Sequence, residues 1–124
     1  MKEILLVDDD EAICAFLSIL LGKIHKVKVA YDGIGAMYHL SEGYIPDLII
    51  TDLKMPELSG FDLIRNIKNS QIYRHIPIIV LTGSVCTEAR ETCYLLGIED
   101  YINKPFNPYK LKDRITYFLN TETI

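Results

Sequence analysis

Short apolar segments alternate with longer segments of helical period along the chain, and the alternation occurs five times. The apolar segments are rich in β-branched residues and are mostly apolar on both faces, which is typical of parallel strands buried on both sides. The pattern therefore predicts five strands, each followed by a helix. The predicted strands are Ile4–Val7, Val27–Ala30, Leu48–Thr51, Ile76–Thr82 and Ile98–Ile102.

Residues that favour helix ends separate these strands from the helices. Asp, Ser and Asn cap helix N-termini with a side-chain oxygen, and Gly is typical of helix C-termini. The pattern predicts helices that follow Asp10, cover Ile34–Ser41, begin near Ser59, cover Thr87–Leu96 and begin at Pro108. The residues expected at the other helix ends are Gly22, Gly43, Gly97 and, as the N-cap of the last helix, Asn107.

The first helix carries an apolar stripe at helical spacing, which is expected to face the sheet. The stripe consists of Ile13, Phe16, Leu17, Leu20 and Leu21. These residues are the predicted contribution of the first helix to the core.

Five strand–helix units restrict the topology. Connections between parallel strands are right-handed, so the units form either a closed barrel or an open sheet. A closed barrel of this kind needs about eight strands. The pattern therefore favours an α/β fold with an open, doubly wound sheet in the flavodoxin-like strand order 2-1-3-4-5, with helices on both faces. Ligands of such sheets bind at the carboxyl ends of the strands.

Length, charge and the lengths of the apolar runs limit the number of domains and the kinds of partner that we expect. The 124 residues suffice for one domain, and we expect a single domain over residues 1–124. With 17 acidic and 13 basic residues the net charge is -4, so direct binding of nucleic acid is not expected. No apolar run approaches the ~18 residues of a membrane span, and the N-terminus lacks the features of a signal peptide. A cytoplasmic location without membrane partners is expected.

The three cysteines, Cys14, Cys86 and Cys93, are odd in number and lack Cys-x-x-Cys spacing. This pattern argues against a disulfide framework and against a zinc site. We expect reduced thiols.

Charged and hydroxyl side chains follow four of the predicted strands. In the order 2-1-3-4-5 these four strands are neighbours, and their ends span about 14 Å, so the side chains can converge on one site. Three carboxylates at such a site repel one another, and either a lysine or a divalent cation must offset the repulsion. The residues are Asp8, Asp9 and Asp10 after the first strand, Asp52 after the third, Thr82 and Gly83 at the fourth, and Lys104 after the fifth.

Phosphoryl transfer fits this inventory. It requires a nucleophile, cations that neutralise the phosphoryl oxygens, and oriented hydrogen-bond donors. A carboxylate can be the nucleophile and form an aspartyl phosphate.

Four sequence motifs at the strand ends also occur together, in the same order, in one known family. They are Leu6–Asp9, Asp52–Pro56 with Gly60, Leu81–Gly83, and Gly97–Phe106. On these motifs the chain resembles the response-regulator receiver domain of two-component signalling, from Ile4 to about Leu119. The resemblance is to single-domain members, such as regulators of chemotaxis or of a sporulation phosphorelay.

The resemblance implies roles for the residues at the strand ends. Asp52 would be the phosphoacceptor. Asp9, Asp52 and the backbone carbonyl of Lys54 would bind Mg²⁺, or Mn²⁺ in its place, and Asp8 would act through a metal-bound water. Lys104, the Thr82 hydroxyl and the backbone amides of Lys54 and Gly83 would contact the phosphoryl group.

The resemblance also implies a switch. Tyr101 would turn inward as Thr82 is drawn to the phosphoryl group, and the surface of the fourth helix, fifth strand and fifth helix would change. Lys54 and Ser84 occupy positions associated with the lifetime of the phosphorylated state. We expect Lys54 to affect dephosphorylation more than phosphorylation.

The implied function is that of a signalling protein which catalyses only its own phosphorylation and dephosphorylation. The phosphoryl group would come from a phosphohistidine of a sensor histidine kinase or of a histidine phosphotransfer protein. The switch surface would bind an effector or a second copy of the chain. Because no output domain is expected within residues 1–124, the output would pass through a partner.

Three alternatives remain open from the residues alone. A haloacid-dehalogenase-type phosphohydrolase would use Asp8 as nucleophile and Asp10 as acid/base, but it expects Thr or Val where Ala12 stands and leaves Asp52 without a role. A flavin carrier needs a hydroxyl- and glycine-rich phosphate loop after the first strand, where carboxylates stand instead. An interaction module without phosphoryl chemistry would lack a key residue, and none is lost.

Overall fold

The computed structural model describes residues 1–120, so residues 121–124 of the expected domain lie outside the described range. Strands and helices alternate through the described range, as predicted. The strands are β1 (Glu3–Val7), β2 (Lys26–Ala30), β3 (Leu48–Thr51), β4 (Ile78–Thr82) and β5 (Asp100–Asn103). The helices are α1 (Glu11–Leu21), α2 (Gly33–Ser41), α3 (Gly60–Lys68), α4 (Thr87–Leu96) and α5 (Pro108–Asn120).

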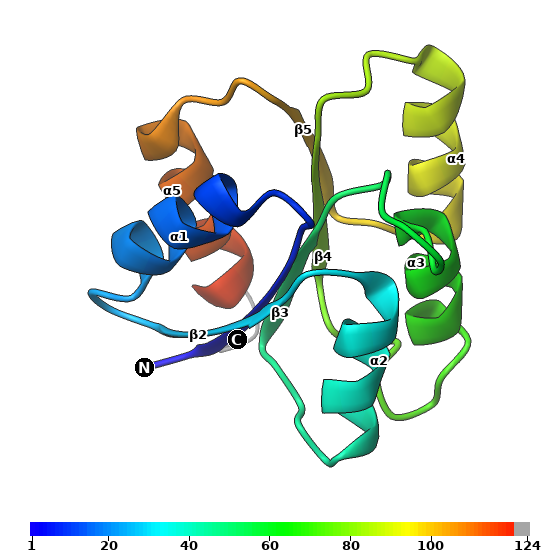
Figure 1. Ribbon diagram of the computed structural model, residues 1–124, viewed down its shortest axis with the longest axis horizontal. Helices are drawn as coiled ribbons and strands as arrows, with labels where there is room; N and C mark the ends of the chain where they lie inside the picture. The colour runs from blue at the N-terminus through cyan, green and yellow to red at the C-terminus, as the bar shows by residue number, and fades with distance from the viewer. Residues whose placement is uncertain (121–124) are drawn as a thin grey trace.

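The strands form one parallel sheet in the order β2-β1-β3-β4-β5. Helices α1 and α5 cover one face of the sheet, and α2, α3 and α4 cover the other (Figure 1). The predicted flavodoxin-like fold and strand order are therefore confirmed. None of the helices in residues 1–120 is both long and apolar enough to cross a membrane.

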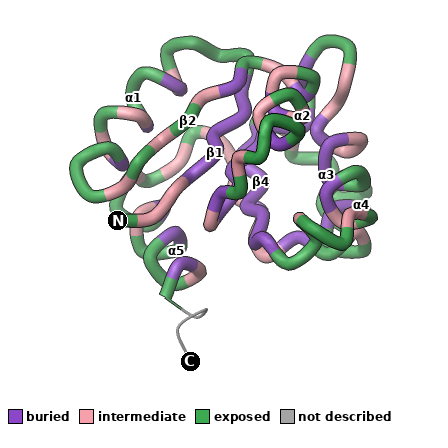
Figure 2. Tube along the Cα trace, turned by 90° about the horizontal axis from the view of Figure 1, so that it is seen from below, coloured by how far each residue is buried: buried purple, intermediate pink, exposed green. Residues whose placement is uncertain are grey.

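The core consists of two layers, one on each face of the sheet. Leu5, Val7 and Ile49 pack with apolar residues of α2, α3 and α4, whereas Ile4 and Leu6 pack with those of α1 and α5. Because alternate residues of a strand point to opposite faces, a central strand must be apolar throughout. Figure 2 shows the result, with buried residues along β1 and β4 and exposed residues on the outer sides of the helices.

Side chains cap the N-termini of α1, α3 and α5 at the predicted residues, and Asp32, which was not predicted, caps α2. The carboxylate of Asp10 accepts hydrogen bonds from the amides of Ala12 and Ile13 at 3.0 and 3.2 Å. Ser59 caps α3, and Asn107 accepts from two amides of the first turn of α5. Helix α4 differs, because its N-cap, Cys86, makes no side-chain capping bond and Cys93 is its one buried residue.

The predicted bounds of β4 and β5 are wrong, and β1 and β2 each begin one residue earlier than predicted. Strand β4 begins at Ile78 and not at Ile76, since Pro77 has no N–H to donate to a neighbouring strand. Strand β5 covers Asp100–Asn103 and not Ile98–Ile102. The amide of Ile98 instead donates to the carbonyl of Cys93 at 3.3 Å, a hydrogen bond that closes the C-terminal turn of α4.

Phe16 does not lie in the core as its place in the apolar stripe predicts. It is 46% exposed and lies 6.4 Å from the Phe106 ring, centroid to centroid. Cys14 is 1% exposed and takes an inner position of α1. Cys14 lies three residues before Leu17 and seven before Leu21, so the buried stripe of α1 includes a cysteine that the predicted stripe left out.

Gly60, the first residue of α3, lies directly against the backbone that follows β3. Its amide donates to the carbonyl of Leu53 at 2.9 Å. A Cβ atom at this position would overlap the carbonyl oxygen of Asp52 and lie 2.7 Å from Cα of Leu53. Glycine at position 60 therefore allows the start of α3 to pack directly against the backbone of Asp52 and Leu53.

We predict that Gly60→Ala lowers the free energy of unfolding by about 1–3 kcal/mol, because the added methyl group forces a backbone shift in a close-packed region. Denaturant unfolding measures the change. The matched control is Gly83→Ala, because nothing lies within 4 Å of a Cβ at that position. Equal changes in the two variants would show that the contact with Asp52 is not what requires glycine.

Candidate functional site

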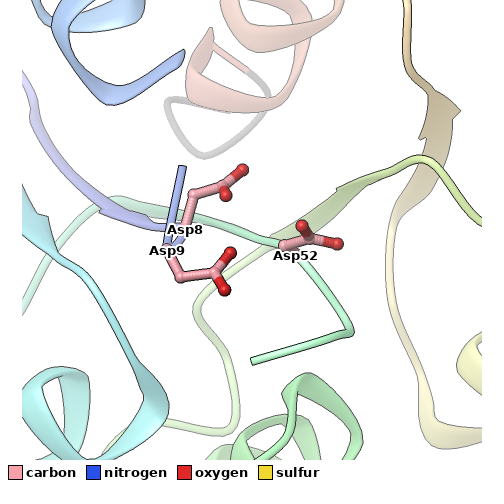
Figure 3. A group of neighbouring side chains, drawn as sticks. All are labelled: Asp8, Asp9 and Asp52. Carbon is pink, nitrogen blue, oxygen red and sulfur yellow. The ribbon is translucent and has the colours of Figure 1, made fainter. Parts of the chain in front are cut away.

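Three carboxylates meet at the carboxyl end of the sheet. Asp8 and Asp9 follow β1, and Asp52 follows β3, the neighbouring strand. One carboxylate oxygen from each residue lies within 4.8 Å of the others. Figure 3 shows the carboxylates of Asp8 and Asp9 directed toward the side on which Asp52 lies. Asp8 and Asp52 are buried and Asp9 is exposed, so the cluster opens to solvent on the Asp9 side.

Lys104 holds two of these carboxylates together. Its Nζ lies 2.8 Å from Oδ2 of Asp8 and 3.1 Å from Oδ2 of Asp52. The lysine directly follows β5, and its peptide bond to Pro105 is cis. The predicted convergence of residues from β1, β3 and β5 is thus observed.

Backbone amides fix the second oxygen of each bridged carboxylate. Oδ1 of Asp8 accepts from the amide of Asp10 at 2.9 Å, and Oδ1 of Asp52 accepts from the amide of Leu53 at 2.6 Å. Each side chain is therefore held at both oxygens. Such fixed orientation is what a reacting or metal-binding carboxylate requires.

Burial and charge have opposite effects on the titration of this site. Desolvation raises the pKa of the Asp8 carboxyl more than the hydrogen bonds from Lys104 and Asp10 lower it. For Lys104, burial lowers the pKa of the ammonium group. The hydrogen bonds with Asp8 and Asp52 and the attraction of their charges outweigh this effect of burial, so the pKa of Lys104 is raised overall. Lys104 therefore stays protonated, while the charged form of Asp8 is held at a cost.

The donor set fits a hard divalent cation. Mg²⁺ and Mn²⁺ are bound in proteins mainly by carboxylate and carbonyl oxygens and water. Three carboxylates and one lysine have a formal net charge of -2, which a dication neutralises. Lys54 is exposed and borders a groove that is also lined by Asp9 and Phe61, next to the carboxylate cluster.

Thr82 ends β4 beside this cluster and is linked to the predicted switch tyrosine through Ser84. Oγ1 of Thr82 accepts from the amide of Ser84 at 3.3 Å. The carbonyl of Ser84 accepts from the Tyr101 hydroxyl at 3.1 Å. Tyr101 is 6% exposed, so its ring points inward. Gly83, between Thr82 and Ser84, is exposed and has open space around Cα.

Two residues near the site are not among the predicted site residues. Nδ2 of Asn103 donates to the carbonyl of Ser84 at 2.6 Å, and Sγ of Cys14 donates to the carbonyl of Asp8 at 3.3 Å. Burial, followed by the charge of Asp8, raises the pKa of Cys14 to about 11, so it is a neutral thiol. A polar residue directly before Lys104 was a visible signal for Asn103, whereas nothing in the sequence marks Cys14.

Asp10 is not a member of the carboxylate cluster and caps a helix instead. Its carboxylate caps α1, and the cluster consists of Asp8, Asp9 and Asp52. A haloacid-dehalogenase-type mechanism needs the second aspartate of its Asp-x-Asp motif as acid/base. The cap geometry therefore counts against that alternative.

Comparison with known proteins agrees with this geometry. A family model described as the response regulator receiver domain matches residues 4–116. This chain belongs to that family. The resemblance based on four motifs is therefore confirmed, and receiver domains are also found among its relatives of known structure.

Two curated relatives illustrate the range of proteins that contain such a receiver domain. The chain is 30% identical over 121 residues to chemotaxis protein CheY1 of Helicobacter pylori, covering 96% of the chain and 98% of the relative. It is 38% identical over 112 residues to a probable cyclic di-GMP phosphodiesterase of Vibrio cholerae, covering 90% of the chain. The chain spans 25% of the length of that relative, and less of two hybrid or sensor histidine kinases that it also matches.

Solved receiver domains have the same architecture. The receiver domain of a histidine kinase from Syntrophus aciditrophicus superposes with a TM-score of 0.90 at 30% identity, covering 98% of this chain and 92% of the other. A sensor histidine kinase receiver domain from Pseudomonas aeruginosa, solved with magnesium coordinated in its active site cleft, gives a TM-score of 0.85 at 31% identity, covering 95% and 97%.

Membership of the receiver-domain family implies a general chemistry. Receiver domains of two-component systems accept a phosphoryl group, bind Mg²⁺ at an acidic pocket and interact with histidine kinases. The cluster of Asp8, Asp9 and Asp52 is compatible with such Mg²⁺ binding.

We predict that Asp8→Asn raises the melting temperature of the metal-free receiver domain, by about 4 °C for each kcal/mol gained. The folded-state pKa of Asp8 is raised, so the folded protein binds a proton more readily than the unfolded chain, and the charged form destabilises the fold as pH rises through that pKa. The gain in melting temperature of Asp8→Asn over the wild type should therefore be complete at neutral pH and absent well below the ordinary carboxyl pKa. Thermal melts at several pH values with a chelator measure it.

The same melts with saturating Mg²⁺ are the internal control. A bound cation stabilises the wild type by mass action and neutralises Asp8, so the advantage of the variant should shrink or reverse. A variant that is less stable than the wild type at neutral pH without metal would contradict the electrostatic argument.

Proposed function

We propose that this receiver domain accepts a phosphoryl group on Asp52 and thereby switches the surface formed by α4, β5 and α5. The donor is a phosphohistidine of a sensor histidine kinase or of a histidine phosphotransfer protein. The observation that carries the proposal is the bridge from Lys104 to Asp52 and Asp8 within a cluster of three carboxylates.

Asp52 is the best-placed nucleophile of the three carboxylates. It follows β3, the middle strand, between the acidic residues after β1 and the hydroxyl and lysine after β4 and β5. Its side chain is 11% exposed, compared with 2% for Asp8, so a donor reaches it more easily. Asp9 is exposed, and the lysine bridge runs to the other two carboxylates. A phosphoryl group on Asp52 therefore meets the donors Thr82 and Lys104 on one side and, on the other, carboxylates that can hold a cation.

In the proposed reaction an Asp52 oxygen forms the new P–O bond while the P–N bond to the histidine breaks, and the electron pair returns to the imidazole nitrogen. Lys104, the Thr82 hydroxyl and the amides of Lys54 and Gly83 hold the phosphoryl oxygens. When Mg²⁺ or Mn²⁺ is bound by Asp9, Asp52 and the Lys54 carbonyl, with Asp8 acting through water, it supplies further charge neutralisation.

The new charge of nearly -2 explains how a local event reaches the surface. Thr82 is drawn to the phosphoryl group, and Tyr101, whose ring already points inward, is held in that position, since Ser84 connects the two side chains. Arg90 of α4 lies 5.9 Å from the Tyr101 ring centroid. Arg114 of α5 pairs with Asp100 of β5 at 2.7 Å. An effector, or a second copy of the chain, would bind this charged and aromatic surface.

The remaining parts of the proposal follow from this role. The domain catalyses its own phosphorylation and dephosphorylation and turns over no other substrate. It acts through a protein partner, without contacting nucleic acid or a membrane directly. Residues 1–124 form one receiver domain. The reducing cytoplasm is the proposed compartment, because Cys14, Cys86 and Cys93 are all free thiols.

We predict that acetyl phosphate with Mg²⁺ adds one phosphoryl group to the protein, and that Asp52→Asn abolishes the addition because it removes the nucleophile. Intact-protein mass spectrometry counts the added groups. Omission of Mg²⁺ should slow the labelling by at least about a hundredfold, the size expected for loss of a main charge-stabilising group.

Asp8→Asn is the matched control, because it removes a carboxylate from the same cluster. It should slow the labelling without preventing a single addition on Asp52. Label that persists in Asp52→Asn and disappears in Asp8→Asn would instead identify a phosphohydrolase-type nucleophile.

We predict that Lys54→Ala changes the rate of dephosphorylation more than the rate of phosphorylation. Lys54 is exposed beside the cluster, so its side chain can crowd or orient the water that attacks the acyl phosphate. The two rates come from the build-up of label and from its decay after the donor is removed. Ser84→Ala, at the second position associated with lifetime, is a parallel variant. Equal changes in both rates would contradict a role in the attack of water.

A further inference from the structure

The backbone of Ser84 connects the end of β4 to two side chains of β5, of which Tyr101 is only one. Its amide donates to Thr82 Oγ1, and its carbonyl accepts from both the Tyr101 hydroxyl and the Asn103 amide group. We call Ser84, Tyr101 and Asn103 the Ser84 clamp. Two side chains of β5, spaced two residues apart on one face of the strand, hold one carbonyl.

The bond from Asn103 is the shorter of the two. It is 2.6 Å long, against 3.1 Å for the tyrosine bond. Nδ2 also lies 3.5 Å from the carbonyl of Thr82. Both partners are carbonyl oxygens, so only the NH₂ end of the amide can face them, and the orientation of the side chain is determined. Asn103 therefore has its own hydrogen bond to the loop, separate from the one that Tyr101 makes.

Asn103 also stands next to the lysine that bridges the carboxylates. The amide of Lys104 donates to the carbonyl of Thr82 at 2.8 Å, which pairs this end of β5 with the end of β4. The Asn103 side chain extends that pairing past the end of the strand to Ser84. The loop that carries Gly83 is thus tied to the same short segment of β5 that positions Lys104.

We infer that Asn103 is a positioning residue, which holds the Thr82–Ser84 segment in place for the phosphoryl group whether or not Tyr101 is inward. This inference rests on the proposed function. If Tyr101 turned outward, the Ser84 carbonyl would keep the Asn103 bond, so the Gly83 amide would remain where the phosphoryl oxygens need a donor. Such preorganisation lowers the cost of binding a phosphoryl group.

The test measures binding of beryllofluoride, a stable mimic of the phosphoryl group, with Mg²⁺ present. Asn103→Ala and Asn103→Asp both remove the donor, and the second keeps the shape of the side chain. Both variants should bind beryllofluoride about twofold to tenfold more weakly than the wild type, the range expected for one lost neutral hydrogen bond. Wild-type affinity in Asn103→Ala would overturn the inference, and thermal melts verify that each variant is folded.

Asn107→Asp is the matched control for the added charge in Asn103→Asp. Asn107 lies four residues along the chain, and its Oδ1 accepts from the amides of Tyr109 and Lys110. An aspartate keeps that acceptor and therefore keeps the cap of α5. The control should bind beryllofluoride like the wild type. If it weakens binding as much as Asn103→Asp does, charge and not the clamp accounts for the loss in that variant.

A double-variant cycle distinguishes the clamp from a general structural role. In Tyr101→Phe or Asn103→Ala the Ser84 carbonyl retains one donor, but in the double variant it has lost both. An acceptor without a partner costs more than one that keeps a single bond. The loss in the double variant should therefore exceed the product of the two single losses. A simple product would mean that the two side chains act independently, which contradicts a shared clamp.

A readout without metal or phosphodonor separates this inference from the proposed function. In the unliganded protein the NMR signals of the Ser84 amide and of the Tyr101 ring should shift in Asn103→Ala and stay in place in Asn107→Asp. If the wild type binds no beryllofluoride and takes no label on Asp52, the proposed function fails, while the NMR comparison still tests the clamp. If the wild type is labelled and the Asn103 variants match it in every measurement, the inference alone fails.

Discussion

The site depends on a conflict between carboxylates that the fold brings together. Parallel strands place Asp8, Asp9 and Asp52 at one edge of the sheet, within 4.8 Å of one another. Their mutual repulsion opposes the compact state, and burial of Asp8 adds a desolvation penalty. The ion pairs to Lys104 offset part of this cost and leave room for a cation to offset the rest. A fold that is strained by its own charges responds strongly when a cation or a phosphoryl group arrives.

The apolar layers on both faces of the sheet keep this arrangement from relaxing. Strands β1, β3 and β4 are buried along their lengths, so the acidic residues cannot separate without disturbing two cores. The close contact between Gly60 and the Asp52 backbone also keeps Asp52 from moving away from the other acidic residues. Stability made by apolar packing thus holds together charges that would otherwise move apart.

Much of this arrangement could be predicted from the sequence, because it depends on periodicity and on position relative to strand ends. Two-sided apolar runs gave the strands, and the polar residues just beyond them gave the carboxylate cluster and Lys104. Tertiary features were less accessible. The exposure of Phe16 and the burial of Cys14 depend on how α1 rotates against the sheet. The role of Asn103 depends on where the loop after β4 places the Ser84 carbonyl, which no pattern along the chain encodes.

Helix α4 is attached differently from the rest of the molecule. Cys93 is its one buried residue, its first turn lacks a side-chain cap, and Leu95 on its outside is 88% exposed. Few buried contacts are lost when such a helix shifts, so a local rearrangement of α4 costs little. The weak attachment of α4 therefore favours rearrangement of this helix but contributes little to thermal stability. A substitution that anchored α4 more firmly would make the protein harder to melt and, under the proposed switch, would make the α4–β5–α5 surface slower to change.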